Sequence, residues 1–264
     1  MISAEHLQVT FNPGTPMETR ALQGMSLTIP SGQFVTVIGS NGAGKSTLLG
    51  AIAGDIACDR GSITIAGRDV TRWPAPKRAR LVARVFQDPL AGSCAHLTLA
   101  ENMALAYRRG QRRSLGRALN RRMMVEFRSH LERLDLGLEN RLGDRMGLLS
   151  GGQRQAVSLL MATLANREIL LLDEHTAALD PKTAVYVADL TRAIVAEKGL
   201  TTLMVTHSMR QALDLGDRTL MLHEGRIVFD VSGAERASLD VPDLLRMFEQ
   251  LRGEALSNDS LLLS

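Results

Sequence analysis

The segment Gly39-Ser40-Asn41-Gly42-Ala43-Gly44-Lys45-Ser46-Thr47 decides the fold of this 264-residue chain. It matches the pattern G-x-x-x-x-G-K-[S/T] of a phosphate-binding loop. Its glycines let the backbone turn successive N–H groups toward an anion, and the helix that follows adds the positive end of its dipole. Lys45 can reach the β and γ phosphates of a nucleotide, and the Ser46 hydroxyl can ligate Mg²⁺. The segment therefore predicts that MgATP is bound.

Both flanks of this loop agree with that interpretation. Residues 34–38 form a mostly apolar run that predicts a buried strand, and residues 45–53 predict a helix that ends at Gly54. The alternative is a glycine-rich turn that merely starts a helix. With a buried strand before the loop and a helix after it, that alternative is the weaker one.

The rest of the chain alternates between strands and helices, with one interruption. Apolar and polar residues alternate at 7–11 and 27–29, which predicts strands. From about residue 97 to 149 strand signals are absent, and Thr98 and Glu101 have the spacing of a capping box, so an inserted helical subdomain is expected. Further strands are expected at 62–66, 82–86, 169–172, 202–205, 219–222 and 226–229, and helices at 153–165 and 181–197. This order predicts an α/β fold with a mainly parallel sheet covered by helices.

Two carboxylates follow the apolar run at 169–172. Asp173 is expected at the carboxyl end of the sheet beside the phosphate loop, where it can hold Mg²⁺ through water. Glu174, one residue further on, is placed to polarise the attacking water as a general base. A strand that ends in Asp-Glu usually marks only a strand terminus. Together with the phosphate loop, it indicates a hydrolytic site.

A second glycine-rich helix start lies at Leu149-Ser150-Gly151-Gly152-Gln153. A serine before two glycines and a helical run predicts another N-terminus able to bind an anion. One nucleotide does not need two such sites in one chain, so each chain is expected to offer this segment to the nucleotide held by a second chain. An ordinary glycine-rich helix cap would be the better interpretation if the segment stood alone.

Taken together, these motifs resemble the ATPase subunits of ABC transporters. The phosphate loop, Gln87, the Leu-Ser-Gly-Gly-Gln segment, Asp173-Glu174, Asp180 and His207 occur in the order and approximate spacing of that family, over about residues 2 to 230. The resemblance implies a P-loop NTPase core with an N-terminal antiparallel β subdomain and an inserted α-helical subdomain. It implies one ABC ATPase domain at 1–230, with a nucleotide-binding core at 1–94 and 151–230, a helical signature subdomain at about 95–150, and a C-terminal helical extension at 231–264.

The resemblance also implies roles for the matching residues. Gln87 resembles a glutamine that senses Mg²⁺ and water and links the core to the helical subdomain. Ser150 and Gly152 resemble groups that touch the γ-phosphate across a dimer. The expected catalytic residues are Glu174, His207 and Gln87; the expected nucleotide-binding residues are 39–47, Phe11, Ser150, Gly151, Gly152, Gln153 and Asp180; and the expected Mg²⁺ ligands are Ser46, Gln87 and Asp173.

Three of these assignments depend on the resemblance most strongly. Asp180 resembles an aspartate that couples the two nucleotide sites. His207 resembles a switch histidine that contacts the γ-phosphate and the catalytic carboxylate, whereas from the residues alone it reads as a loop histidine. Phe11 is the candidate for the aromatic ring that stacks on adenine, and a core position is its alternative.

The chain departs from the family pattern at two positions. His175 follows the expected catalytic glutamate where proline is common, and Ala178 replaces the usual serine before Asp180. Neither change removes a catalytic group. With the residues around them, they resemble ATPases that are paired with tryptophan/tyrosine-type substrate-binding proteins and with permeases like those of branched-chain amino-acid importers.

Positive charge is concentrated in one segment. The chain has a net charge of +3, yet seven arginines and no acidic residue occur between 108 and 122. Contact with anionic lipid head groups or acidic permease loops is one interpretation, and a solvated helix face is the other. Aromatic residues make up only 3% of the chain, which argues against a base-stacking platform for nucleic acid.

Neutralising Arg112, Arg113 and Arg117 together tests the first interpretation. Each basic residue near an anionic surface contributes about 1 kcal/mol, so the triple variant is expected to be recovered poorly with anionic vesicles or with the permease. Sedimentation with vesicles of increasing anionic content measures this. Unchanged recovery would favour the solvated face.

The function expected from these observations is the ATP-hydrolysing subunit of an importer. Its expected partners are a second copy of itself, an integral membrane permease and, indirectly, a substrate-binding protein. No apolar stretch has the length of a membrane span and no signal peptide is seen, so the expected location is cytoplasmic, peripheral on the inner face of the membrane through the permease. A non-transport ATPase such as an iron–sulfur assembly scaffold, or an exporter subunit, is the alternative.

Overall fold

The glycine-rich loop connects a buried strand to a helix. The computed structural model describes residues 1–111, 118–165 and 167–250. In it, β3 (Phe34–Gly39) leads into the loop and α1 (Lys45–Ala53) leaves it. Gly54 ends α1 with a φ of 86°, a left-handed conformation that suits glycine, and its N–H donates to the carbonyl of Gly50. The predicted strand and helix are confirmed.

The loop follows an inner strand of a six-stranded sheet and lies at the carboxyl ends of the parallel strands. The strand order is β10-β9-β3-β8-β7-β6; the five strands from β9 to β6 are parallel to one another, and β10 is antiparallel to β9. Parallel strands end at the same edge, so the segments that follow β3, β6, β7 and β8 meet there. The bounds are β6 (Val82–Val85), β7 (Ile169–Asp173), β8 (Thr201–Val205), β9 (Arg218–His223) and β10 (Arg226–Ser232).

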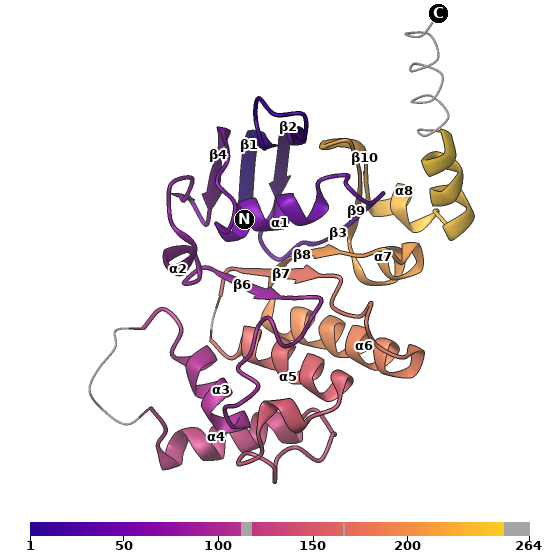
Figure 1. Ribbon diagram of the computed structural model, residues 1–264. Helices are drawn as coiled ribbons and strands as arrows, with labels where there is room; N and C mark the ends of the chain where they lie inside the picture. The colour runs from indigo at the N-terminus through magenta and orange to yellow at the C-terminus, as the bar shows by residue number, and fades with distance from the viewer. Residues whose placement is uncertain (112–117, 166, 251–264) are drawn as a thin grey trace, which may run out of the picture.

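A four-stranded antiparallel sheet lies over α1, in the order β2-β1-β4-β5. Side chains of this sheet, of α1 and of one face of the six-stranded sheet form a single apolar cluster, so α1 is packed between the two sheets (Figure 1). The bounds are β1 (Ile2–Phe11), β2 (Thr19–Ile29), β4 (Arg60–Ile65) and β5 (Arg68–Asp69).

Helices cover the opposite face of the six-stranded sheet. α5 (Gly151–Thr163) and α6 (Pro181–Lys198) contribute to the apolar cluster there. α5 starts two residues before the predicted helix, so Gly151 and Gly152 lie in its first turn. The α/β fold with a mainly parallel sheet, an antiparallel sheet and added helices is confirmed.

The stretch predicted to lack strands is helical. It contains α3 (Leu99–Tyr107), α4 (Arg121–Glu132) and the short helix η1 (Met146–Leu148), which share an apolar cluster with α5. The predicted capping box is present, because Glu101 N donates to Thr98 Oγ1 at 3.2 Å and Thr98 N donates to Glu101 Oε2 at 2.7 Å. Arg112, Arg113 and Arg117 lie outside the described residues.

The last described part of the chain packs beside the sheet. It comprises α7 (Met209–Leu215), α8 (Gly233–Ala237) and a helix over 241–250, while the remainder of the predicted extension lies outside the described residues. Ile38, Ala212 and Leu244 share one apolar cluster, so the helix at 241–250 is anchored on α7 (Figure 1). A short helix, α2 (Ala75–Arg78), precedes β6. Within the described residues, no helix combines the length and the apolar character that crossing a bilayer demands.

Candidate functional site

The backbone of the loop requires glycine at two close approaches. Gly39 has a φ of 151°, and a Cβ there would lie 2.3 Å from the carbonyl oxygen of Leu222. Gly44 has a φ of 97°, and a Cβ there would lie 2.4 Å from the carbonyl oxygen of Ala21. Both contacts are shorter than a real Cβ allows. The loop is thus pressed between β9 and β2, with the N-terminus of α1 directly behind it.

Lys45 is folded onto the loop that precedes it. Its side chain is buried, and Nζ donates to the carbonyl oxygens of Gly39 and Ser40, each at 2.9 Å. Burial lowers the pKa of Lys45 from its ordinary value, while the carboxylates of Glu174 and Asp173 oppose this shift. The ammonium group and both predicted carboxylates therefore lie within electrostatic reach of one another.

Glu174 and His207 form a pair at the carboxyl edge of the sheet. His207 Nε2 lies 2.6 Å from Glu174 Oε1, and the Glu174 side chain is only 12% exposed. Glu174 follows β7 and His207 follows β8, so adjacent parallel strands bring together residues that are 33 positions apart. This distance is that of a strong hydrogen bond.

The backbone at Glu174 adopts an unusual conformation. Its φ is 46°, in the left-handed region that residues other than glycine seldom enter. Glu174 N donates to the carbonyl of Val205 at 3.0 Å, and its own carbonyl accepts from Ala177 N at 2.9 Å. Such a conformation costs about 1–3 kcal/mol and persists only where surrounding contacts hold it, which is common in active sites.

Asp173 is paired with an arginine that sequence reasoning missed. Arg84 of β6 donates to Asp173 Oδ2 at 2.6 Å and to Asp55 Oδ2 at 2.8 Å. Its guanidinium also lies 4.7 Å from the centre of the Phe86 ring. A charged residue inside the apolar run at 82–86 was the available signal. Gln87, the next residue after Phe86, is exposed at the start of the loop toward α3.

His175, which stands where the expected pattern commonly has proline, is buried in the core. The ring is 1% exposed, and its Nε2 lies 2.9 Å from Thr191 Oγ1 of α6. That hydroxyl donates to the Val187 carbonyl, so the imidazole must supply the proton in the contact with Thr191. Burial lowers the pKa of His175 to about 4, and the ring is neutral at neutral pH. His175 faces α6, whereas the side chain of Glu174 faces His207.

The segment at 149–153 starts α5 with a capping box. Ser150 Oγ accepts from Gln153 N at 3.3 Å, and Gln153 Oε1 accepts from Ser150 N at 3.1 Å. A Cβ on Gly152 would lie 2.1 Å from Thr183 Cγ2, so α5 and α6 approach closely at this point. Because α5 and α1 cover opposite faces of the six-stranded sheet, the two glycine-rich helix starts of one chain belong to different layers.

Two further predicted residues lie at element ends. Asp180 is the N-cap of α6, and its Oδ1 accepts from Thr183 N at 3.1 Å. Thr183 is also the residue that contacts Gly152, so Asp180 is close to the start of α5. Phe11 ends β1 and is 40% exposed, so its alternative interpretation as a core residue is wrong. The placement of adenine against Phe11 stays a prediction.

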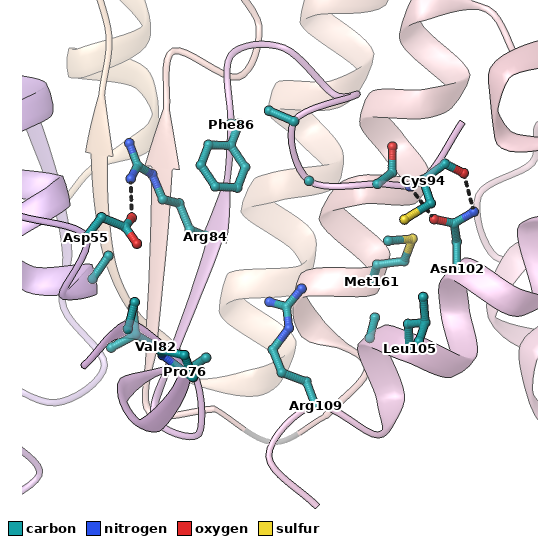
Figure 2. Close-up of a pocket in the computed structure, with 17 residues that line it drawn as sticks. Asp55, Pro76, Val82, Arg84, Phe86, Cys94, Asn102, Leu105, Arg109 and Met161 are labelled. Carbon is teal, nitrogen blue, oxygen red and sulfur yellow. Dashed lines mark hydrogen bonds and ion pairs between the residues drawn. The ribbon is translucent and has the colours of Figure 1, made fainter. Parts of the chain in front are cut away.

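A groove of about 510 Å³ lies between the β6 edge and α3 (Figure 2). Its floor includes Arg84, Phe86 and the loop that carries Gln87. Asn102 of α3 clamps this loop, because it accepts from Cys94 N at 2.8 Å and donates to the Cys94 carbonyl at 3.0 Å. None of the residues 39–47 lines the groove, so it is separate from the phosphate loop.

Comparisons with known proteins cover most of this chain. A family model described as ABC transporter matches residues 22–177. A tyrosine transport ATP-binding protein of Clostridioides difficile (strain R20291) is 45% identical over 251 residues, which cover 94% of this chain and 99% of that protein. A thiamine import ATP-binding protein of Escherichia coli (strain K12) is 36% identical over 204 residues, 77% of this chain and 83% of that protein. A solved dimeric, post-hydrolysis ATP-binding cassette bound to ADP and Pi has a TM-score of 0.76 and 27% identity over 88% of this chain and 98% of that chain.

Proposed function

The chain belongs to the ABC transporter family and hydrolyses ATP, and on that premise we propose that it powers an importer as one of two copies that enclose two MgATP molecules. The observation that carries this proposal is the Glu174–His207 pair at 2.6 Å, held within electrostatic reach of Lys45. A general base, a hydrogen-bonding partner and a phosphate-binding cation then share one edge of the sheet. This arrangement suits attack of water on a terminal phosphate.

Each of these three residues has a separate task in hydrolysis. Lys45 leaves the carbonyl oxygens of Gly39 and Ser40 to bind the phosphates, for which the loop N–H groups and the start of α1 supply further donors. Glu174 accepts the proton of the attacking water, whose oxygen bonds to the γ-phosphorus as the bond to ADP breaks. His207 donates its Nε2 proton to the Glu174 carboxylate and so holds it, and the same ring is the proposed hydrogen-bonding partner of the γ-phosphate.

The residues at the loop also fit Mg²⁺. This ion prefers oxygen ligands and is usually held by one or two carboxylates together with substrate phosphates. The Ser46 hydroxyl, which is exposed at the start of α1, and the Asp173 carboxylate, which is within electrostatic reach of Lys45, provide such a set. Gln87 is the third proposed ligand. When bound, Mg²⁺ would neutralise charge on the β and γ phosphates.

A second copy completes the site in this proposal. Ser150 is exposed at the start of α5, and that helix covers the face of the sheet opposite to α1. An N-terminus so placed can serve a nucleotide on another chain. Asp180 is bonded to Thr183, which packs against Gly152 at the start of α5. Hydrolysis at one nucleotide can therefore be transmitted to the other nucleotide along the segment 174–180. The solved cassette that resembles this chain is itself dimeric.

The groove between β6 and α3 is the proposed docking place for the permease. A segment seated there would press on the loop that carries Gln87 and on α3 at once. Arg84 lies in the floor of the groove and bonds to Asp173, so the groove is physically connected to the Mg²⁺ carboxylate. Movement of the permease would in this way change the site of hydrolysis, and ATP binding would in turn move the permease.

A single arginine in this groove tests the docking place. Leu105 of α3 lines the groove and is 57% exposed. Leu105→Arg is expected to reduce co-purification with the permease in detergent by about tenfold or more, because an apolar contact is replaced by a desolvated charge. Val125→Arg is the matched control, since Val125 of α4 is 66% exposed and outside the groove. Equal recovery of both variants would place the permease elsewhere.

The proposed cargo is an aromatic amino acid or a related small molecule. Support comes from the 45% identity to a tyrosine transport ATP-binding protein over nearly its whole length. The cargo does not touch this chain in the proposed arrangement, so the test uses any substrate-binding protein that is encoded next to it, titrated with the standard amino acids. Co-purification with soluble iron–sulfur assembly proteins, or the absence of any adjacent binding protein, would favour the scaffold or the exporter instead.

A further inference from the structure

Gln211 joins the two segments that carry the Glu174–His207 pair. It lies in α7, a helix beside β3 and α6 (Figure 1). Its side-chain carbonyl accepts a hydrogen bond from Thr176 Oγ1 at 3.0 Å and a second from Thr206 Oγ1 at 3.2 Å. Thr176 is two residues after Glu174, and Thr206 is one residue before His207. One oxygen therefore connects both sides of the pair.

The hydrogen bonds around this oxygen have a defined direction. Thr206 Oγ1 accepts from Ser208 N at 3.1 Å, so its own proton is free to go to Gln211. Ser208 Oγ caps α7 by accepting from Gln211 N at 3.2 Å. The residues on either side of His207 are thus joined by hydrogen bonds that run from Ser208 to Thr206 and from both of these to Gln211. Both threonines are buried, and without Gln211 their hydroxyls would lose a partner that water cannot readily replace.

The connection matters because Glu174 needs external support. Its left-handed backbone is held by the bond to the Val205 carbonyl on one side and by the segment 175–177 on the other. Thr176 is the residue of that segment that reaches across to α7. The Gln211 bridge fixes the distance between the segments that follow β7 and β8, and it does so from outside the pair itself.

We propose that Gln211 is a positioning residue for hydrolysis, whose side-chain carbonyl holds the Glu174 and His207 segments in the arrangement that the reaction needs. This inference rests on the proposed roles of Glu174 and His207. It assigns Gln211 no contact with nucleotide. Loss of the bridge should therefore reduce kcat and leave the binding of ATP unchanged.

The central experiment compares Gln211→Met with Gln211→Glu in the full chain. Methionine has a similar length and offers no strong acceptor, whereas a carboxylate can accept both hydroxyl protons. Gln211→Met is expected to lower kcat by about 10- to 100-fold, since small misplacements of reacting groups have effects of that size, with KM within about twofold of its original value. Gln211→Glu is expected to recover most of the lost rate. Arg210→Ala, on the same helix and with an 84% exposed side chain, is the control that should behave as the unmodified chain.

A double-mutant cycle separates positioning from a general structural role. If Gln211 acts by holding Glu174 against His207, then removal of His207 removes the arrangement that it supports, and Gln211→Met should change kcat by less than about twofold in a His207→Ala background. The same fold loss in both backgrounds would overturn the proposal. So would a rise in KM at unchanged kcat, or a Gln211→Glu variant as slow as Gln211→Met.

Two threonine variants keep the test decisive if Gln211→Met fails to fold. Thr176→Val and Thr206→Val each remove one donor at nearly constant volume, and each is expected to lower kcat severalfold with retained thermal stability. Normal kcat in both would overturn the proposal. Glu174→Gln and His207→Ala are measured alongside. If these retain hydrolysis, the proposed site itself is wrong; if they lose it while the Gln211 and threonine variants keep it, only the inference about Gln211 fails.

Discussion

Replacing Glu174 by glutamine is expected to stop ATP turnover and to leave ATP binding intact. The amide has the same shape but cannot accept the proton of the attacking water, and loss of a general base lowers rates by about 10²–10⁴-fold. The Glu174 side chain is 12% exposed and lies 2.6 Å from His207 Nε2, so it is already held in place for this role. The ATP-bound dimer should therefore accumulate.

Three measurements check this expectation for Glu174. Phosphate release gives turnover, titration with a fluorescent ATP analogue gives affinity, and light scattering after gel filtration in MgATP gives the dimer fraction. Glu197→Gln is the matched control, because it makes the same change on a half-exposed carboxylate of α6 that pairs with Arg133. Hydrolysis near the normal rate in Glu174→Gln would reject Glu174 as the base.

Replacing Ser150 by arginine is expected to prevent the ATP-dependent dimer while the single chain still binds nucleotide. The side chain is exposed at the start of α5, where the proposed second nucleotide approaches, and arginine would occupy that space. Because Lys45 and α1 lie in the other layer of the molecule, nucleotide binding to one chain should change by less than about twofold. Hydrolysis should fall by at least about 100-fold, since the site is complete only in the dimer.

The substitution at Ser150 also removes a helix cap. This loss of helix stability has to be separated from the expected steric block of dimer formation. The lost contact to Gln153 N is of a kind that stabilises by about 1 kcal/mol. Asn120→Arg is the matched control, because Asn120 caps α4 through Met123 N at 2.9 Å and is likewise exposed. It should lose similar stability and keep the dimer. A stable ATP-dependent dimer of Ser150→Arg would contradict the proposed arrangement of two chains.

Patterns of neighbouring residues in the sequence predicted the strand, loop and helix that form the phosphate-binding part of the site. The sequence of β3, loop and α1 was foreseeable because its glycines, apolar run and Gly54 act on their immediate neighbours. The capping box at Thr98 was foreseeable for the same reason, since its two hydrogen bonds span three residues. Among the helices after β8, α7 was not predicted, whereas α8 and the helix at 241–250 fall within the helical extension that the resemblance implied at 231–264. α7 packs on β3, and α8 packs on β9 and β10. A local sequence pattern does not contain the stability that such packing supplies.

The contacts that organise the site were beyond the reach of such patterns. Arg84 meets Asp173 across 89 positions, and Thr176 meets Gln211 across 35. These side chains come together only because β6, β7 and β8 are adjacent and in a particular register. His175 was noticed as a departure from the family, but its burial against Thr191 depends on how α6 lies on the sheet.

The sequence by itself determined that this chain holds a phosphate, because the loop at 39–47 makes its own anion site from consecutive N–H groups and one lysine. It also determined which family the chain resembles, through motifs whose order along the chain is directly readable. Only the tertiary structure decided how the carboxylate, the histidine and their support by Gln211 lie together. Hydrogen bonds act over about 3 Å, and the register of parallel strands sets which distant residues come within that range.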